Sequence, residues 1–184
     1  PLPTLFFLTF ASHSPLVCPM MSNSANFNIS RKGLSFDELS RFSLNSTLEI
    51  GPDTLKSIQH CRQYLDQKMQ ESDALFYGIN TGFGYLQNVR IDNSQLEQLQ
   101  ENLIMSHACG MGEEVPQEIV KLMLLLKVQS LSYGHSGVQL ETVQRLADMF
   151  NYNILPVVYT QGSLGASGDL APLSHLCLPL LGKG

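Results

Sequence analysis

Three consecutive small residues near the end of the chain, Ala166, Ser167 and Gly168, can build a reactive group from the backbone itself. A tight turn can press the amide nitrogen of Gly168 onto the carbonyl carbon of Ala166, because glycine has no side chain to obstruct the approach. Ring closure with loss of water gives an imidazolone, and elimination of the Ser167 hydroxyl leaves a methylene group conjugated with that ring. The product is an electrophile that none of the twenty side chains provides. The tripeptide alone is common, so only the surrounding sequence makes this chemistry credible.

The residue that follows the triplet argues against a serine hydrolase. Residues 165–169 have the sequence Gly-Ala-Ser-Gly-Asp, which invites comparison with G-x-S-x-G, the turn that presents the nucleophilic serine of α/β-hydrolases. Asp169 stands where that turn requires its second glycine. We interpret Asp169 and Leu170 instead as structural residues that hold the turn in a ring-closing geometry.

A second glycine-rich segment covers residues 77–84, with the sequence Tyr-Gly-Ile-Asn-Thr-Gly-Phe-Gly. Its glycines permit backbone angles that are closed to other residues, and they leave aromatic and polar side chains displayed on a turn. Neither of the two glycine patterns that cradle nucleotide phosphates occurs here. Taken alone, the segment is equally consistent with a functional loop and with a structural one, and Asn80 can hydrogen-bond either a substrate or its own loop.

Three segments together resemble the histidine ammonia-lyase family, within the superfamily of aromatic amino acid lyases. They are residues 77–84, residues 106–112 (Ser-His-Ala-Cys-Gly-Met-Gly) and residues 162–175 (Gly-Ser-Leu-Gly-Ala-Ser-Gly-Asp-Leu-Ala-Pro-Leu-Ser-His), in the order and spacing of that family. The resemblance extends from about Leu34 to the last residue, whereas a complete family member is far longer. It implies that Ala166, Ser167 and Gly168 form 4-methylidene-imidazol-5-one (MIO) without a metal or a diffusible cofactor.

The reaction implied by the resemblance is the elimination of ammonia from L-histidine to give trans-urocanate, the first step of histidine degradation. In this family the amine adds to the methylene derived from Ser167, and a tyrosine that matches Tyr77 removes the β-proton. A free phenol ionises only near pH ~10, so this role demands positive charge, backbone dipoles or hydrogen bonds that stabilise a phenolate.

Two further residues are candidates for substrate binding. His107 matches the family position that contacts the substrate ring, and a neutral imidazole offers one donor and one acceptor for that purpose. Asn80 is the second candidate. Lyases of other aromatic amino acids also carry Ser-His at this place, so a tyrosine or phenylalanine ammonia-lyase or aminomutase with the same MIO group remains an alternative. A non-catalytic helical assembly module is the second alternative.

The elements that must position these residues are mainly helices. Capping boxes at Ser35 and Ser94 predict two helix starts, the second leading toward His107. A third helix is expected from Pro52-Asp53 onward, because apolar residues recur there at three- and four-residue steps. Residues 119–131 are apolar around most of the helix and predict burial on several sides. Residues 138–150 predict another helix, and residues 154–159 are the only predicted strand.

Composition and the chain ends predict the partners, the compartment and the bounds of the domain. The net charge of −5 argues against a nucleic-acid partner, and no apolar run is long enough for a membrane-spanning helix. Four widely spaced cysteines and no paired histidine ligands predict reduced thiols in a cytoplasmic protein and no metal site. Residues 1–20 are interpreted as an upstream or non-native extension, and residues 21–184 as the truncated N-terminal part of a catalytic domain. The resemblance also implies a homotetramer in the full-length protein.

Overall fold

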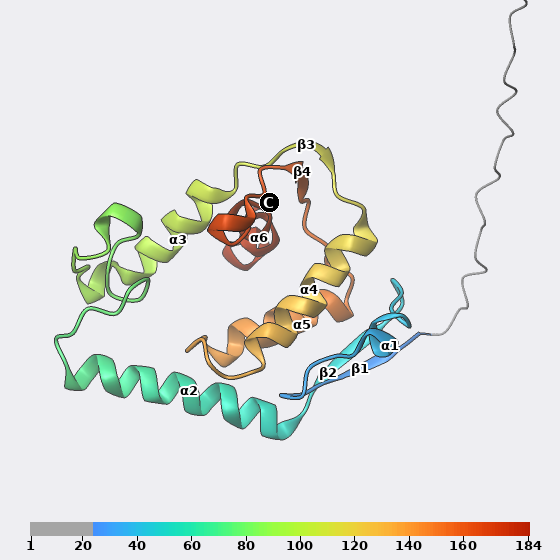
Figure 1. Cartoon of the computed structure of the whole chain (residues 1–184), viewed down its shortest axis with the longest axis horizontal. Coiled ribbons are helices and arrows are strands. Elements are labelled where there is room, and N and C mark those ends of the chain that lie inside the picture. The colour runs from blue at the N-terminus through green and yellow to red at the C-terminus, as the bar shows by residue number, and fades with distance from the viewer. Residues whose placement is uncertain (1–23) are drawn as a thin grey trace, which may run out of the picture.

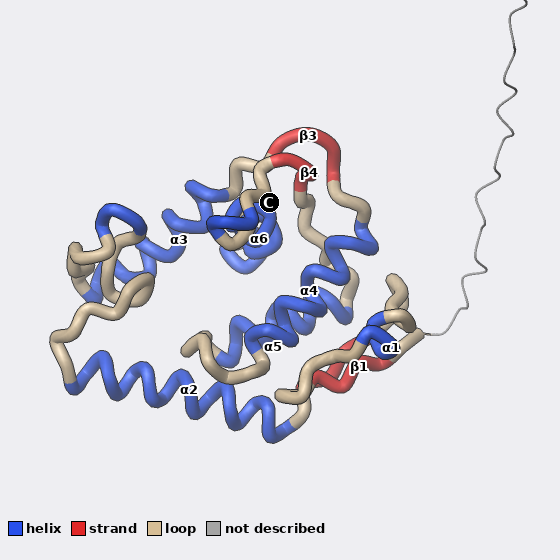
Figure 2. Tube along the Cα trace, in the orientation of Figure 1, coloured by secondary structure: helices blue, strands red, loops and turns tan. Residues whose placement is uncertain are grey.

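The computed structural model describes residues 24–184 and is mainly α-helical, as the sequence predicts (Figure 1). The interpretation of residues 1–20 therefore lies outside the described residues. Three helices, α2, α4 and α5, lie on one side of the molecule, and α3 and α6 lie together on the other side, where two short strands connect them to the rest (Figure 2). The candidate site residues belong to this second side and to its loops.

The first elements are two short parallel strands, β1 (Asn26–Ile29) and β2 (Thr47–Ile50), with the one-turn helix α1 (Phe36–Leu39) between them. The predicted capping box at Ser35 is confirmed, since its hydroxyl accepts the Glu38 N–H while its own N–H donates to the Glu38 carboxylate at 2.8 Å. Neither strand is predicted from the sequence. Each has four residues, too few for their alternating burial to stand out from the sequence.

The hydrophobic core forms where α4 (Gln117–Leu131) packs against α5 (Leu140–Asn151). Residues from β1, β2 and α2 (Pro52–Glu71) complete it. Among its fully buried members are Ile29, Ile58, Leu124, Leu125, Val128, Val143, Leu146 and Phe150. Helix α2 begins at the predicted proline, and its predicted apolar stripe is its less exposed face, although only Thr54 and Ile58 are fully buried.

The prediction that α4 is buried on several sides is wrong for this part of the molecule. One face of α4 is buried, but Ile119 and Leu126 are 48% and 46% exposed. No element among the described residues covers the face that carries them. An unpartnered apolar face of this kind is typical of a surface that meets another segment or another subunit.

Helix α3 (Leu96–His107) is confirmed, but its predicted capping box is not. A short 3-10 turn, η2 (Asn93–Gln95), precedes the helix, and α3 itself starts without a side-chain cap. Ser94 is engaged elsewhere, because its N–H and its hydroxyl both donate to Oδ1 of Asp92, at 2.9 and 2.6 Å. Because the charged carboxylate of Asp92 accepts both bonds, Ser94 is not available to cap α3, and the two bonds hold the pKa of the Asp92 carboxyl below its usual value.

Strands β3 (Met111–Glu114) and β4 (Tyr159–Gln161) form an antiparallel pair that joins α3 to the last part of the chain. The predicted strand at 154–159 is therefore displaced, since only Tyr159 belongs to β4. The 3-10 turn η3 (Gly165–Ser167), helix α6 (Leu170–Cys177) and the turn η4 (Leu178–Leu181) follow, and α6 packs against α3. This pairing carries the end of α3 to the segment that contains Ala166, Ser167 and Gly168.

Candidate active site

The segment with Ala166, Ser167 and Gly168 is a tight turn that ends in a left-handed residue. The N–H of Ser167 donates to the Leu164 carbonyl at 3.0 Å, and the N–H of Gly168 donates to the Gly165 carbonyl at 3.1 Å. Gly168 has φ +89° and ψ 28°, a conformation that side chains rarely adopt. A Cβ added to Gly168 would meet no atom within 4 Å. Glycine is therefore required here by backbone conformation, and the space around it is open.

Asp169 continues the turn in a second left-handed conformation, with φ 56° and ψ 44°. This is uncommon for a residue with a side chain and stores conformational energy. Two bonds hold it in place: the hydroxyl of Ser163 donates to Oδ1 of Asp169 at 2.5 Å, and the N–H of Asp169 donates to the Leu164 carbonyl at 3.2 Å. The interpretation of Asp169 as a residue that holds the turn agrees with these contacts. Ser163 was not singled out in the sequence, where nothing distinguishes it from other loop serines.

The loop with Tyr77 folds this side chain back over its own glycines. The Tyr77 ring lies edge-on to the Phe83 ring, with centroids 6.0 Å apart, and the Gly84 N–H donates to the phenol oxygen at 3.4 Å. Gly78 and Gly84 both have positive φ, which lets the loop close. These two contacts hold the phenol oxygen against the glycines of its own loop.

Asn80 lies in the same loop and is 2% exposed. Its Oδ1 accepts the Phe76 N–H at 2.6 Å, and its Nδ2 donates to the Ala74 carbonyl at 2.9 Å. Both ends of the side-chain amide are therefore used to shape the loop. A role in substrate binding stays a prediction, and it requires one of these two bonds to be exchanged for a bond to the substrate.

His107 is the last residue of α3 and is half-buried. Its Nδ1 lies 2.8 Å from the Leu103 carbonyl oxygen and 3.1 Å from the Ser106 hydroxyl. A carbonyl oxygen only accepts, so Nδ1 carries the proton in the neutral ring. The other nitrogen, Nε2, then has a free lone pair. His107 is therefore arranged to accept a hydrogen bond from an N–H group at the end of α3.

The structure brings the loop after His107 against Gly162, the start of the segment that leads to the Ala166–Gly168 turn. A Cβ on Gly162, the first residue of the third segment, would lie 3.1 Å from Cα of Gly110, three residues after His107. By contrast, no hydrogen bond between described residues joins residues 77–84 to residues 162–169. Figure 1 shows the Tyr77 loop at the opposite end of α3 from β4.

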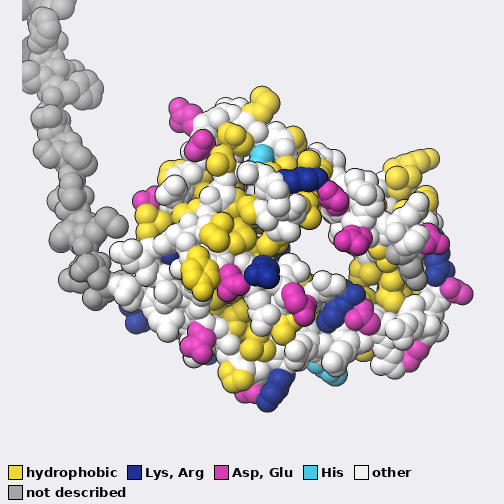
Figure 3. Space-filling view, turned by 180° about the vertical axis from the view of Figure 1, so that it is seen from behind, with side chains coloured by type: hydrophobic (Ala, Val, Ile, Leu, Met, Phe, Trp, Pro, Cys, Tyr) yellow, Lys and Arg dark blue, Asp and Glu magenta, His cyan; other side chains and the backbone are white. Residues whose placement is uncertain are grey.

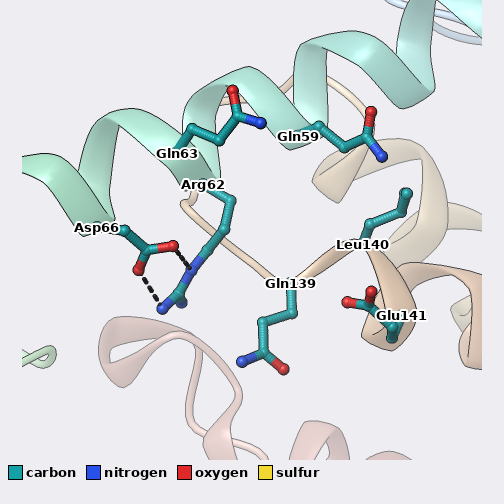
Figure 4. Close-up of a pocket in the computed structure, with 7 residues that line it drawn as sticks. All are labelled: Gln59, Arg62, Gln63, Asp66, Gln139, Leu140 and Glu141. Carbon is teal, nitrogen blue, oxygen red and sulfur yellow. Dashed lines mark hydrogen bonds and ion pairs between the residues drawn. The ribbon is translucent and has the colours of Figure 1, made fainter.

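A pocket of about 550 Å³ lies elsewhere, between α2 and the start of α5 (Figure 4). Its lining is mostly polar, and within it Arg62 donates two hydrogen bonds to the carboxylate of Asp66. None of the site residues predicted from the sequence lines this pocket. The chemistry expected of the chain is therefore not located there.

The residues that the structure describes form neither a metal site nor a membrane-spanning helix. Residues 24–184 contain no cluster of three or more histidine, cysteine or acidic side chains that is arranged to hold a metal ion. No helix in the same residues is long and apolar enough to cross a membrane. Cys61, Cys109 and Cys177 all carry free thiols.

Comparison with known proteins identifies the family. The model of the aromatic amino acid lyase family matches residues 34–184. The histidine ammonia-lyase of Deinococcus radiodurans is 55% identical over 137 residues, which are 74% of this chain and 26% of that protein. The chain thus spans about a quarter of the length of the curated relatives it matches.

Solved structures agree with the sequence comparison. The histidine ammonia-lyase of Trypanosoma cruzi superposes with a TM-score of 0.76 and 37% identity, over 87% of this chain and 31% of that one. A tyrosine aminomutase from Streptomyces globisporus superposes with a TM-score of 0.80 and 28% identity, over 87% of this chain and 30% of that one. These likenesses confirm the predicted helical ammonia-lyase fold. The chain belongs to the aromatic amino acid lyase family.

Proposed function

We propose that the protein containing this chain eliminates ammonia from L-histidine to give trans-urocanate. The observation that carries the proposal is the state of His107, whose Nε2 is left free to accept a hydrogen bond on the loop that contacts Gly162, four residues before Ala166. A substrate imidazole can donate its N–H to this nitrogen, whereas a phenyl ring cannot. The 55% identity to a histidine ammonia-lyase supports the same substrate.

The reactive group proposed is MIO, formed autocatalytically from Ala166, Ser167 and Gly168. The turn fits its formation, because Gly168 holds a left-handed conformation that is open to glycine, Asp169 holds one that is uncommon for other residues, and Ser163 fixes the Asp169 carboxylate. Once formed, the group supplies an electron-poor alkene that takes up the substrate amine and makes it a better leaving group. The chain's own residues must then place the substrate and remove its proton.

In this proposal Tyr77 takes the β-proton of histidine at its phenol oxygen. The Gly84 N–H and the Phe83 ring hold that oxygen in place within the loop. His107 orients the substrate ring through Nε2, and Asn80 either binds the substrate or keeps the Tyr77 loop in shape. No diffusible cofactor is needed for these roles.

The active site is proposed to combine residues from several copies in a homotetramer. Within one copy the Tyr77 loop precedes α3, a helix of 12 residues that spans ~18 Å, whereas the other end of α3 leads to Gly110, which contacts Gly162. A base must come within hydrogen-bond reach of the proton it abstracts, so Tyr77 is proposed to act in the site of a neighbouring copy. Apolar side chains spread over the face of the chain in Figure 3 also suit subunit contacts. Ile119 and Leu126 are two of the exposed apolar residues.

Two assignments from the sequence remain part of this proposal. We place residues 21–184 in the N-terminal part of the catalytic domain, and residues 1–20, which precede the family match at residue 34, outside it. The enzyme is proposed to act in the cytoplasm on its small-molecule substrate. N-terminal sequencing of protein purified from its source tests the first assignment, since a start within residues 1–20 contradicts it.

A substrate panel on the purified full-length protein tests the activity. We expect histidine to be converted to urocanate and tyrosine and phenylalanine to be left unchanged. Coumarate or cinnamate without urocanate would instead assign the site to another aromatic amino acid. No product from any substrate, together with an uncyclised triplet, would favour a non-catalytic assembly module.

A further inference from the structure

We propose that His175, which no part of the reaction so far uses, is a positioning residue that sets the place of His107 relative to the Ala166–Gly168 turn. The inference rests on the proposed function, because it assigns His175 a role in substrate binding at that same site. His175 lies in α6, the helix that begins directly after Asp169. It reaches across to the loop that follows His107.

The link is a single hydrogen bond with a defined direction. The backbone N–H of Gly110 donates to Nε2 of His175 at 2.9 Å. Since Nε2 accepts, it has no proton, and the neutral ring carries its proton on Nδ1. The side chain is 7% exposed, and this burial lowers the pKa of His175 and favours the neutral ring that the bond requires.

The surroundings of the bond are too tight to allow another arrangement. A Cβ on Gly110 would lie 3.0 Å from Nε2 of His175 and 3.2 Å from Cβ of Tyr159. The Tyr159 ring also lies edge-on to the imidazole, with centroids 5.3 Å apart. A Cβ on Gly162 would come 3.1 Å from Cα of Gly110. The loop at Gly110, helix α6 and the segment from Tyr159 to Gly162 therefore meet at Gly110. This packing leaves the imidazole of His175 little freedom to move.

The hydrogen bond between Gly110 and His175 links the His107 loop to the helix that follows the Ala166–Gly168 turn. Gly110 follows His107 by three residues, and between them the Cys109 N–H donates to the His107 carbonyl at 2.8 Å, so the connection is a tight turn. His175 follows Asp169 by six residues within a continuous helix. A shift at Gly110 is therefore transmitted to His107, whereas the Ala166–Gly168 turn is fixed through α6.

A positioning role predicts a specific kinetic pattern in the full-length protein. The variant His175→Leu keeps the bulk of the side chain but cannot accept the Gly110 N–H. We expect it to form MIO, observed as loss of two water molecules in the intact mass, and to raise KM for histidine by about tenfold with kcat changed by less than about threefold. The variant His175→Gln offers an amide oxygen near the place of Nε2, and we expect it to restore KM to within about threefold of wild type.

Two further variants make the test decisive. His135→Gln removes an exposed histidine from the loop between α4 and α5, and it should leave KM and kcat unchanged. Gly110→Ala keeps both hydrogen-bonding groups but inserts a methyl group 3.0 Å from Nε2, so it should raise KM even if His175→Leu does not fold. Deuterium exchange of residues 107–112 should accelerate in His175→Leu and not in His175→Gln.

The outcomes separate this inference from the proposed function. An active wild type with unchanged KM in His175→Leu and Gly110→Ala overturns the positioning role and leaves the lyase activity standing. Equal losses of kcat in His175→Leu and His175→Gln also overturn it, because they indicate a general packing defect. A wild type that makes MIO but no urocanate contradicts the proposed function, and deuterium exchange then still tests the His175–Gly110 bond.

Discussion

The backbone N–H of Gly84 donates to the phenol oxygen of Tyr77 at 3.4 Å, across a loop that the two residues begin and end. The positive φ of Gly84 turns the chain so that this N–H faces the ring. Sequence alone identifies a tyrosine suited to remove a proton, but it leaves open what holds its phenol oxygen in place. The loop holds that oxygen through its own backbone N–H.

Replacing Tyr77 by phenylalanine tests its role as the base. We expect Tyr77→Phe to lower kcat for histidine in the full-length protein by roughly 10²–10⁴-fold, the range for loss of a general base. The ring contact with Phe83 is retained, so the protein should fold and its intact mass should still show the loss of two water molecules. Tyr85→Phe, at a fully exposed tyrosine in the same region, is the matched control and should keep wild-type kcat. Equal activity of Tyr77→Phe and wild type would assign proton removal to another group.

Replacing Gly168 by alanine is expected to affect MIO formation much more than protein stability. The variant Gly168→Ala places a side chain at φ +89°, which costs roughly 1–2 kcal/mol, but its Cβ meets no atom within 4 Å. We therefore expect a folded protein with a modestly lowered thermal midpoint and little or no MIO, measured by intact mass. A variant that loses two water molecules as completely as wild type would show that the left-handed glycine is dispensable.

His107 is expected to control substrate choice. The variant His107→Leu removes the acceptor Nε2 and leaves the imidazole N–H of the substrate unpaired, so kcat/KM for histidine should fall about 10²-fold or more. The value for phenylalanine should fall far less, because its ring offers no N–H to His107. Parallel losses for both substrates would mean that His107 acts on a group common to all amino acids.

Burial of His175 makes a contribution to stability that depends on pH. Its pKa in the folded protein is lowered by burial below the usual 6.5 of a free imidazole, so the unfolded chain binds more protons as the pH falls. The contribution is complete above pH 6.5 and is lost as the pH falls from there toward the lowered folded-state pKa. We expect the thermal midpoint of wild type to fall over this range by more than that of His175→Gln. Parallel curves would show that His175 does not titrate differently on folding.

Lys121 is expected to be essential for stability and irrelevant to catalysis. It is fully buried, its Nζ donates to the Leu44 carbonyl and to Asn153 Oδ1, and it lies 4.5 Å from the centre of the Phe150 ring. The variant Lys121→Met leaves both acceptors unpaired, which costs about 2–4 kcal/mol. Denaturant unfolding should show this loss, whereas the exposed control Lys56→Met should be within error of wild type. An unchanged midpoint for Lys121→Met would mean that water replaces the lost donor.

The helices were predictable where apolar periodicity is long, and the exceptions have physical causes. Helix α2 begins at Pro52 as predicted, because proline suits a first turn and the apolar steps that follow have helical spacing. The prediction of a capping box at Ser94 was wrong, because the N–H and the hydroxyl of Ser94 both donate to Asp92, two residues earlier. The exposure of Leu126 depends on which segments pack against α4, and helical periodicity does not encode that.

The candidate site was predictable as a set of residue types but not as an arrangement. Ala166, Ser167 and Gly168 are recognisable because their order permits ring closure and because the segments around them resemble those of the family. The tether between Ser163 and Asp169 depends on a left-handed backbone at a non-glycine residue, which has no sequence signal. The bond from Gly110 to His175 joins residues 65 positions apart, and only the folded chain brings them together.

The intact mass of the freshly purified full-length protein tests the central claim most directly. The account predicts a polypeptide lighter than its translated sequence by two water molecules, with the loss located in a peptide that contains residues 166–168 and absent from a Ser167→Ala variant. A mass equal to that of the translated sequence would contradict it, because the proposed reactive group would not have formed.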